Sequence, residues 1–266
     1  MNKTTGCRHC RDMDQLGFDI SMAFQPIVDL DRQAIFAYEA LVRGPAGEPA
    51  GEVFKQVNEE NLYRFDQACR VKAIEWAAKL GLEHHLSINF MPNAVYRAES
   101  CIQATLQAAE QFGFPLDKII FEITEADRVK DKQHLSNIVD YYKKRGFLTA
   151  IDDFGAGYAG LNLLAVFVPD IVKLDMELVR DIDQRPTQQI IVKQMVAMCQ
   201  ELEVKVVAEG VETEGELQYL QGLGVSLFQG YLLARPGFES LPEPRFALCQ
   251  FDCYHQAIGG LERPDV

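Results

Sequence analysis

Acidic and amide side chains recur at the ends of short apolar runs in this sequence. The clearest case is Asp152-Asp153, two adjacent carboxylates that follow the run Phe147–Ile151. A single acidic residue after a strand is commonplace, because it often caps the next helix. When polar residues follow several such runs, they instead indicate a shared site. The polar residues at or near the ends of these runs are Glu39, Asn89, Glu122, Asp152, Asp153, Lys173, Glu209, Glu212 and Gln229.

The chemistry of such a set is that of hard cations. Carboxylates gathered in one place repel each other unless a counter-charge joins them. Ligation by oxygen without histidine favours magnesium or manganese over zinc. The adjacent pair Asp152-Asp153 is suited to bridging two ions, which would admit a phosphate ester and activate a water toward phosphorus. Lys173, inside an apolar run, is either a buried ion-pair partner or a functional group, and its place among acids favours function.

The composition excludes several classes of protein. The chain has 266 residues, of which 48% are hydrophobic, with a net charge of −13. So acidic a protein repels the backbone of nucleic acids, and we expect no nucleic-acid polymer as a partner. No apolar stretch approaches the ~20 residues of a membrane helix. The start Met1-Asn2-Lys3 does not resemble a signal peptide, so we expect a cytoplasmic protein with reduced cysteines.

The elements that must position these residues alternate between strands and helices. We expect strands at 23–28, 34–41, 85–89, 118–121, 147–151, 171–174, 204–208 and 226–228. Apolar residues at helical spacing predict helices at 64–80, 102–112, 134–145, 188–202 and 214–223. This order predicts an α/β fold of the (β/α)8 TIM-barrel type, in which the carboxyl ends of the strands carry the chemistry.

The first two strands depart from that plan. Only residues 29–33 separate them, which is too short for a crossover helix, so we expect an antiparallel hairpin and a modified barrel with an antiparallel first strand. The barrel domain should span residues 21–245. Residues 1–20 would form an N-terminal appendage with a C-x2-C pair, and residues 246–266 a C-terminal tail.

The two termini carry cysteine pairs. If the ends of the closed barrel lie near one another, Cys7, Cys10, Cys249 and Cys253 could share a structural zinc ion. The C-x3-C spacing of Cys249 and Cys253 is not typical of zinc sites, and free thiols or a redox-labile pair are the alternatives.

Together the motifs resemble the EAL-domain phosphodiesterases, which hydrolyse the bacterial second messenger cyclic di-GMP. The resemblance covers residues 21 to about 245. It is carried by an ordered set: Glu39-Ala40-Leu41-x-Arg43, Glu122-x-Thr-Glu125, Asp152-Asp153-Phe154-Gly155-x-Gly157, Lys173, Glu209-Gly210-Val211-Glu212 and Gln229-Gly230-Tyr231. The tripeptide Glu39-Ala40-Leu41 alone carries no information, whereas the full ordered set of motifs is highly specific.

The resemblance implies hydrolysis of cyclic di-GMP to linear pGpG with two Mg²⁺ or Mn²⁺ ions in each active site. One ion would be held by Glu39, Asn89, Glu122 and Asp152, and the second by Asp152, Asp153 and Glu209. Lys173 would hydrogen-bond the attacking water, and Glu209 is the other candidate for handling its proton. The residues that the resemblance places on the substrate are Gln25, Arg43, Glu212, Gln229 and Pro236.

Further expectations come from the same resemblance. Glu125 would anchor the loop that starts at Asp153 rather than bind metal, and the protein would be a homodimer. Met91 stands where the family usually has a serine two residues after Asn89, which predicts altered surroundings of that amide rather than lost catalysis.

Two other functions compete with hydrolysis. A catalytically silent receptor for cyclic di-GMP, or a protein-interaction module, would have the same fold, but every proposed metal ligand is present here. An enolase-like barrel would also use oxygen ligands for magnesium, but it does not explain the Asp-Asp pair or the glycine-containing loop.

Overall fold

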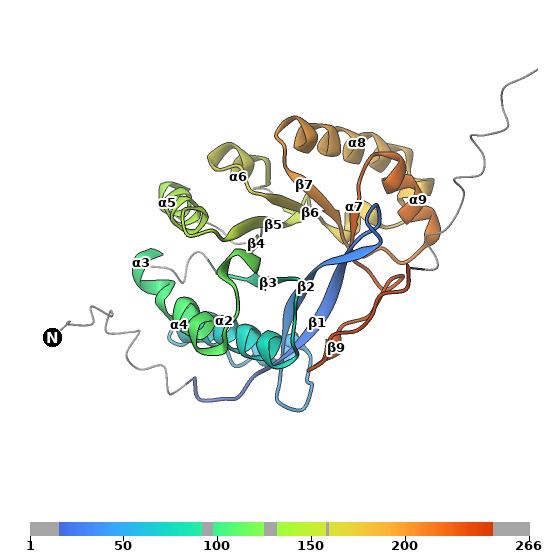
Figure 1. Ribbon diagram of the computed structural model, residues 1–266. Coiled ribbons are helices and arrows are strands. Elements are labelled where there is room, and N and C mark those ends of the chain that lie inside the picture. The colour runs from blue at the N-terminus through green and yellow to red at the C-terminus, as the bar shows by residue number, and fades with distance from the viewer. Residues whose placement is uncertain (1–15, 92–97, 125–131, 158–159, 247–266) are drawn as a thin grey trace, which may run out of the picture.

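Eight strands, β1 to β8, close into a barrel in the computed structural model of the protein (Figure 1). The structure describes residues 16–91, 98–124, 132–157 and 160–246. The strands are β1 Ser21–Asp29, β2 Ala34–Arg43, β3 His85–Asn89, β4 Ile119–Thr124, β5 Leu148–Phe154, β6 Ile171–Leu174, β7 Lys205–Ala208, β8 Leu227–Phe228 and β9 Gly237–Phe238. The predicted barrel fold is therefore confirmed.

Helices lie between the strands in sequence and pack around the outside of the sheet (Figure 1). The α-helices are α1 Ala50–Phe54, α2 Leu62–Lys79, α3 Ala98–Cys101, α4 Gln103–Phe112, α5 Lys132–Lys143, α6 Gly160–Val166, α7 Met176–Val179, α8 Pro186–Glu201 and α9 Glu214–Gly222. The described part of the chain also contains the 3-10 helices η3 Leu116–Lys118 and η4 Ile182–Gln184. None of the helices in the described ranges combines the length and apolar character needed to cross a membrane.

The first strand is antiparallel to both of its neighbours in the barrel. β1 pairs with β2 in a hairpin from Ser21↔Arg43 to Asp29↔Ala34, and it closes the barrel by pairing with β8. Strands β2 to β8 are parallel to one another. The expected antiparallel start is thus confirmed, and its physical reason is the short turn between β1 and β2.

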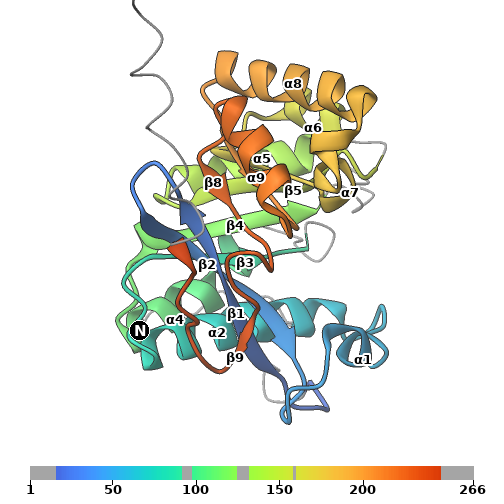
Figure 2. The ribbon, with the colours of Figure 1, turned by 90° about the vertical axis from the view of Figure 1, so that its right-hand side faces the viewer.

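The amino-terminal half of β1 has a further partner. β9 pairs with Ala23 and Phe24, whereas β8 pairs with Val28 and Asp29. Figure 2 shows β9 running beside the hairpin. Because β1 is antiparallel, its start lies at the end of the barrel where the parallel strands finish. The segment around β9 therefore extends the barrel wall at its mouth.

Two separate apolar cores hold the barrel. The larger one fills the space between the outer face of the sheet and the helices. The smaller one fills the inside of the barrel and consists of Ile27, Ala37, Ile120, Ala150, Ile171, Val207 and Leu227. Each of these residues comes from a different strand. They form an apolar floor beneath the mouth.

Candidate active site

The polar residues predicted from sequence lie directly above that floor. Side chains alternate between the two faces of a strand, so residues two apart point the same way. Glu122 follows the floor residue Ile120 by two positions, and Lys173 follows Ile171 in the same way. The same spacing relates Ala37 to Glu39, Ala150 to Asp152, Val207 to Glu209 and Leu227 to Gln229. The alternation that makes the floor apolar therefore directs these polar side chains into the mouth.

Lys173 lies at the centre of this layer and is fully buried. Its ammonium Nζ faces four carboxylates: it lies 2.7 Å from Glu209 Oε1, 2.9 Å from Asp152 Oδ1, 3.0 Å from Glu122 Oε2 and 3.4 Å from Glu39 Oε2. Three of these acids lie on β2, β4 and β5, and Glu209 directly follows β7. Lys173 was expected to be either a buried ion-pair partner or a functional group. It is a buried ion-pair partner and lies inside the candidate site.

A bulge explains how adjacent carboxylates reach one site. On a regular strand Asp152 and Asp153 would point to opposite faces. The pairing of β5 with β6 shifts register between Ile151 and Phe154, and Asp153 has a φ of 53°. Such a bulge redirects a side chain, and left-handed backbone outside glycine is found at functional sites. Asp153 consequently joins the same mouth as Asp152.

The carboxylates form two groups that share Asp152. In each group, one oxygen from each carboxylate lies within 4.8 Å of the corresponding oxygens of the others. The first consists of Glu39, Glu122 and Asp152, and the second of Asp152, Asp153 and Glu209. These are the carboxylates of the two ligand sets that the resemblance implies, and Asn89 lies beside the first group.

Amide side chains orient Glu39. Asn89 Nδ2 donates to Glu39 Oε1 at 3.1 Å, and Gln229 Nε2 donates to Glu39 Oε2 at 2.8 Å. Gln229 Nε2 also lies 3.3 Å from Gln25 Oε1, and Gln25 Nε2 donates to the Ala234 carbonyl at 3.1 Å. This chain of amides links the mouth to the segment that leads into β9.

Burial and mutual repulsion shift the titration of the acids. The pKa of Glu122 is raised to about 8, chiefly by burial and also by Glu39 and Asp152, while Lys173 and the hydrogen bond from Ser87 act in the opposite direction. The pKa of Glu209 is also well above its usual value, chiefly through burial. Burial and Asp152 raise the pKa of Asp153 to about 6. Burial alone would lower the pKa of Lys173, but the surrounding carboxylates hold it well above its usual value.

The site is suited to divalent cations. One lysine faces four carboxylates, and Asp153 adds a fifth acid nearby. Among the described residues, buried Asp152 Oδ1 accepts no well-formed hydrogen bond despite its contact with Lys173, and buried Gln229 Oε1 accepts none either. Buried acceptors without a well-formed hydrogen bond, together with oxygen ligands, fit magnesium, manganese or calcium ions and their waters.

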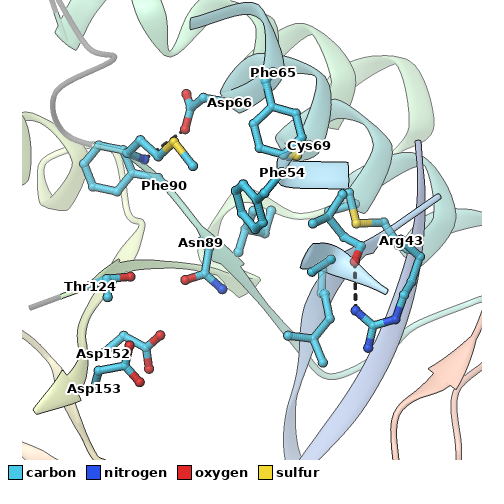
Figure 3. Close-up of a pocket in the computed structure, with 18 residues that line it drawn as sticks. Arg43, Phe54, Phe65, Asp66, Cys69, Asn89, Phe90, Thr124, Asp152 and Asp153 are labelled. Atoms are coloured by element: carbon cyan, nitrogen blue, oxygen red, sulfur yellow. Dashed lines mark hydrogen bonds between the residues drawn. The ribbon is translucent and has the colours of Figure 1, made fainter. Parts of the chain in front are cut away.

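Two pockets meet at Asp152 and Asp153. One of about 320 Å³ extends past Asn89 toward Phe54 and Phe65, between the sheet and helices α1 and α2 (Figure 3). The other, of about 260 Å³, extends over the ends of β6 to β8. It is lined by Gln25, Glu39, Asp152, Asp153, Asp175, Met176, Glu209, Gly210, Glu212, Gln229, Gly230 and Tyr231. An extended ligand can thus reach to both sides of the carboxylates.

Close backbone packing shapes the second pocket. A Cβ on Gly230 would lie 2.0 Å from the Val211 carbonyl oxygen and 2.4 Å from its nitrogen. The Val211 amide donates to the Gln229 carbonyl at 3.1 Å. Only glycine permits this approach, which fixes the loop that carries Glu209 and Glu212 against the end of β8.

The other residues predicted to contact substrate lie farther from Lys173. Arg43 lines the larger pocket, but its Nη1 donates to the neighbouring Val42 carbonyl at 2.8 Å (Figure 3). Glu212 lies on the rim of the smaller pocket, with its oxygens 2.8 Å from Nη1 and Nη2 of Arg180. Pro236 is half-buried directly before β9 and is not among the residues lining either pocket.

Several sequence expectations lie outside the described residues. Glu125 and the four terminal cysteines, Cys7, Cys10, Cys249 and Cys253, belong to this group. The loop-anchoring role of Glu125, the structural zinc and the two terminal appendages therefore stay predictions.

Sequence reasoning assigned no role to some residues around the site. Buried Ser87 donates from Oγ to Glu122 Oε1 at 2.5 Å. Arg180 pairs with Glu212 across 32 positions of sequence. The Met91 amide donates to Asp66 Oδ1 at 2.9 Å, so a buried helix carboxylate fixes the chain after Asn89. The sequence feature that could have identified Ser87 is a polar residue within an apolar strand. No sequence feature indicated the pairing of Arg180 with Glu212 or of Met91 with Asp66.

Comparison with known proteins places this geometry in a family. The EAL domain family model matches residues 14–236. The antirepressor BluF of Escherichia coli, described as regulated by blue light and temperature, is 31% identical over 221 residues, which are 83% of this chain and 55% of BluF. The cyclic di-GMP phosphodiesterase RocR of Pseudomonas aeruginosa is 33% identical over 64% of this chain and 42% of RocR. The chain thus spans about half the length of these curated relatives.

Solved structures agree with the family match. A standalone EAL protein from Vibrio cholerae, in a form bound to cyclic di-GMP, has a TM-score of 0.85 and 53% identity, covering 88% of this chain and 99% of that one. Klebsiella pneumoniae BlrP1, in a complex with manganese and cyclic di-GMP, has a TM-score of 0.81 and 37% identity, covering 86% of this chain and 58% of that one. The chain therefore belongs to the EAL domain family.

Proposed function

We propose that this protein hydrolyses cyclic di-GMP to linear pGpG and requires divalent cations to do so. The single observation that carries the proposal is the pair of carboxylate groups sharing Asp152, gathered around Lys173 at the barrel mouth. Relatives named as cyclic di-GMP phosphodiesterases and a structural neighbour bound to manganese and cyclic di-GMP support it.

The carboxylates would hold two ions. Glu39, Glu122 and Asp152, with Asn89 beside them, would bind one ion, and Asp152, Asp153 and Glu209 the other. When bound, Mg²⁺ or Mn²⁺ would polarise a phosphoryl oxygen and lower the pKa of a water molecule. Since Asp152 belongs to both groups, it would contribute a ligand to each of the two sites.

Lys173 and Glu209 are placed to manage charge and protons. Lys173 Nζ contacts Glu209 Oε1 at 2.7 Å, and Glu209 lines the smaller pocket. The ammonium would donate to the attacking water or to a phosphoryl oxygen and stabilise the negative charge that develops in the transition state. Glu209, whose pKa is raised by burial, would accept a proton from the nucleophile when it is ionised. The surrounding carboxylates keep Lys173 protonated, so Glu209 is the candidate to accept that proton.

The pockets support a substrate with two bases. They extend in opposite directions from Asp152 and Asp153. A cyclic dinucleotide bound with one phosphate at the carboxylates would direct its nucleosides into both. Gln25, Gln229 and Glu212 would contact one half, and Arg43, after turning from the Val42 carbonyl, would contact the other. Pro236 would contact a guanine only if the segment before β9 moved.

The test is an assay of pGpG release. Cyclic di-GMP is incubated with the protein and Mn²⁺ or Mg²⁺, with a parallel sample in EDTA, and products are separated by chromatography. We expect pGpG only with the cation and none from Glu39→Gln. Glu52→Gln is the matched control, because it replaces an exposed acid on α1 that pairs with Lys55, and it should retain the parent rate. Equal turnover in EDTA or in Glu39→Gln would reject the proposal.

One comparison favours a second function. BluF is named an antirepressor, so a relative with 31% identity is described by a regulatory action rather than by hydrolysis. The alternative is a receptor or protein-interaction module without turnover. Tight binding of cyclic di-GMP with no pGpG released in Mn²⁺ would favour this alternative. The homodimer and the cytoplasmic location expected from the sequence stay predictions.

A further inference from the structure

Ser87 is a polar residue at an apolar position of the barrel interior. It lies on β3 two residues before Asn89, the place that a floor residue takes on the other strands. Seven floor residues, one from each of the other barrel strands, are hydrophobic. Ser87 has no exposed surface. A buried hydroxyl in an otherwise apolar layer needs a partner, and its identity indicates why the hydroxyl is there.

The partner is Glu122. Ser87 Oγ donates to Glu122 Oε1 at 2.5 Å, and Lys173 Nζ donates to Glu122 Oε2 at 3.0 Å. The first bond lies at the short end of the range for a hydroxyl and a carboxyl oxygen. The register of β3 and β4 sets this contact, because Ser87 pairs with Ile120 and Asn89 pairs with Glu122. Ser87 therefore lies one layer below the carboxylate and holds its lower oxygen.

The two contacts differ in what an arriving cation would do to them. Lys173 is shared among four carboxylates, so its bond to Oε2 can be exchanged for another. Ser87 contacts Glu122 from beneath, away from the other carboxylates of the mouth, and that bond does not compete with a cation. Hydrogen bonds that fix a ligating group in place commonly change metal affinity by 10–100-fold when they are removed.

We propose that Ser87 is a positioning residue for the metal site: its hydroxyl holds Glu122 Oε1 so that Oε2 is presented to the cation. This inference rests on the proposed function for its metal but concerns affinity for the ion rather than turnover. It assigns Ser87 no contact with substrate.

The experiment measures Mn²⁺ binding by isothermal titration calorimetry on the full chain with no nucleotide present. Ser87→Ala should bind Mn²⁺ about tenfold more weakly than the parent at one of its sites. Thr149→Val is the matched control. It removes another buried hydroxyl, which donates to Asp170 Oδ2 at 2.9 Å from β5, outside the candidate site. This control should lose thermal stability without losing Mn²⁺ affinity.

Further variants separate positioning from packing. Ser87→Thr keeps the hydroxyl and should recover affinity relative to Ser87→Ala. If Ser87→Ala does not fold, Ser87→Cys, which has a weak donor of similar shape, takes its place with the same expected loss. Parent-like Mn²⁺ affinity in the variant without the hydroxyl would overturn the inference and leave the proposed function standing. A parent that binds Mn²⁺ but releases no pGpG would reject hydrolysis alone, and a parent without Mn²⁺ binding would reject both.

Discussion

Lys173 Nζ lies 2.7 Å from Glu209 Oε1, the shortest of its contacts with the four carboxylates at the barrel mouth. β6 supplies the lysine, and Glu209 directly follows the adjacent strand β7. In the metal-free protein this ammonium offsets the repulsion that the carboxylates exert on each other. A divalent cation would take over that role and release the lysine for the phosphate. Lys173 would therefore stabilise the site when metal is absent and take part in its chemistry when metal is bound.

Replacing the lysine tests this balance. Lys173→Met keeps most of the side-chain volume but leaves buried carboxylates without their cation, which should lower the free energy of unfolding by about 3 kcal/mol in EDTA at pH 8. Addition of Mn²⁺ should recover much of that loss. Urea denaturation with and without Mn²⁺ measures both. Lys193→Met, at an exposed position on α8, should change stability by less than about 0.5 kcal/mol. If Lys173→Met and Lys193→Met lowered the free energy of unfolding equally, Lys173 would not be offsetting the repulsion among the carboxylates.

The raised carboxyl pKa values predict the pH dependence of the metal-free protein. Glu122 titrates near 8 in the folded chain, above its ordinary 4.5. Between these values the folded state binds more protons than the unfolded state, so the free energy of unfolding falls as the pH rises from about 5 to about 8. Mn²⁺ requires the ionised carboxylate, so its stabilising effect should grow over the same range. Denaturation at several pH values in EDTA measures the slope.

Glu122→Gln provides the comparison for that titration. The amide keeps the shape of the side chain but does not ionise, so the metal-free stability of this variant should depend less on pH. Asp153, with a pKa of about 6, contributes a smaller share because it is less buried than Glu122. A parent protein whose stability rises steadily with pH over this range would contradict the assigned titration.

The bulge at Asp153 predicts different results for two substitutions. Asparagine tolerates the left-handed backbone better than alanine does. Asp153→Asn should therefore fold with near-parent stability, whereas Asp153→Ala should lose about 1 kcal/mol more. Both should weaken Mn²⁺ binding, because each removes a carboxylate from the second group. Calorimetry and thermal denaturation distinguish the two effects. Equal stability of the two variants would show that the backbone at this residue is unstrained.

Gly230 should resist any side chain. In Gly230→Ala the new Cβ would overlap the Val211 backbone, so we expect a loss of about 2 kcal/mol and displacement of the loop carrying Glu209. Turnover should fall with it. Gly222→Ala is the control, because nothing lies within 4 Å of its Cβ and it sits in helix α9, where alanine should add about 0.5 kcal/mol. Stability of Gly230→Ala equal to that of the parent would exclude the close approach.

Much of the barrel could be predicted from the order of its elements. Apolar runs and helical spacing are local properties, and they located the barrel strands and the main helices to within a few residues. The five-residue connection between the first two strands predicted their antiparallel hairpin, confirmed in the pairing of Ser21 with Arg43. β9 was not predicted, because its two residues carry no alternation and depend on the exposed edge of β1.

The site was predictable in its membership but not in its details. Carboxylates at the ends of parallel strands must converge, so Glu122, Asp152 and Glu209 were found from sequence. The bond from Ser87 to Glu122 depends on strand register, and the pairing of Arg180 with Glu212 depends on how two loops fold against each other. Neither property can be read from the spacing of residues along the chain.

The number and position of the cations bound at the barrel mouth would decide whether the carboxylates form a two-metal site. Crystals soaked in Mn²⁺ and measured at the manganese absorption edge would locate each ion by its anomalous scattering. We expect two ions that share Asp152, one beside Glu39 and Glu122 and one beside Asp153 and Glu209. A mouth with no ion, in which Lys173 still holds the four carboxylates at saturating Mn²⁺, would contradict this expectation.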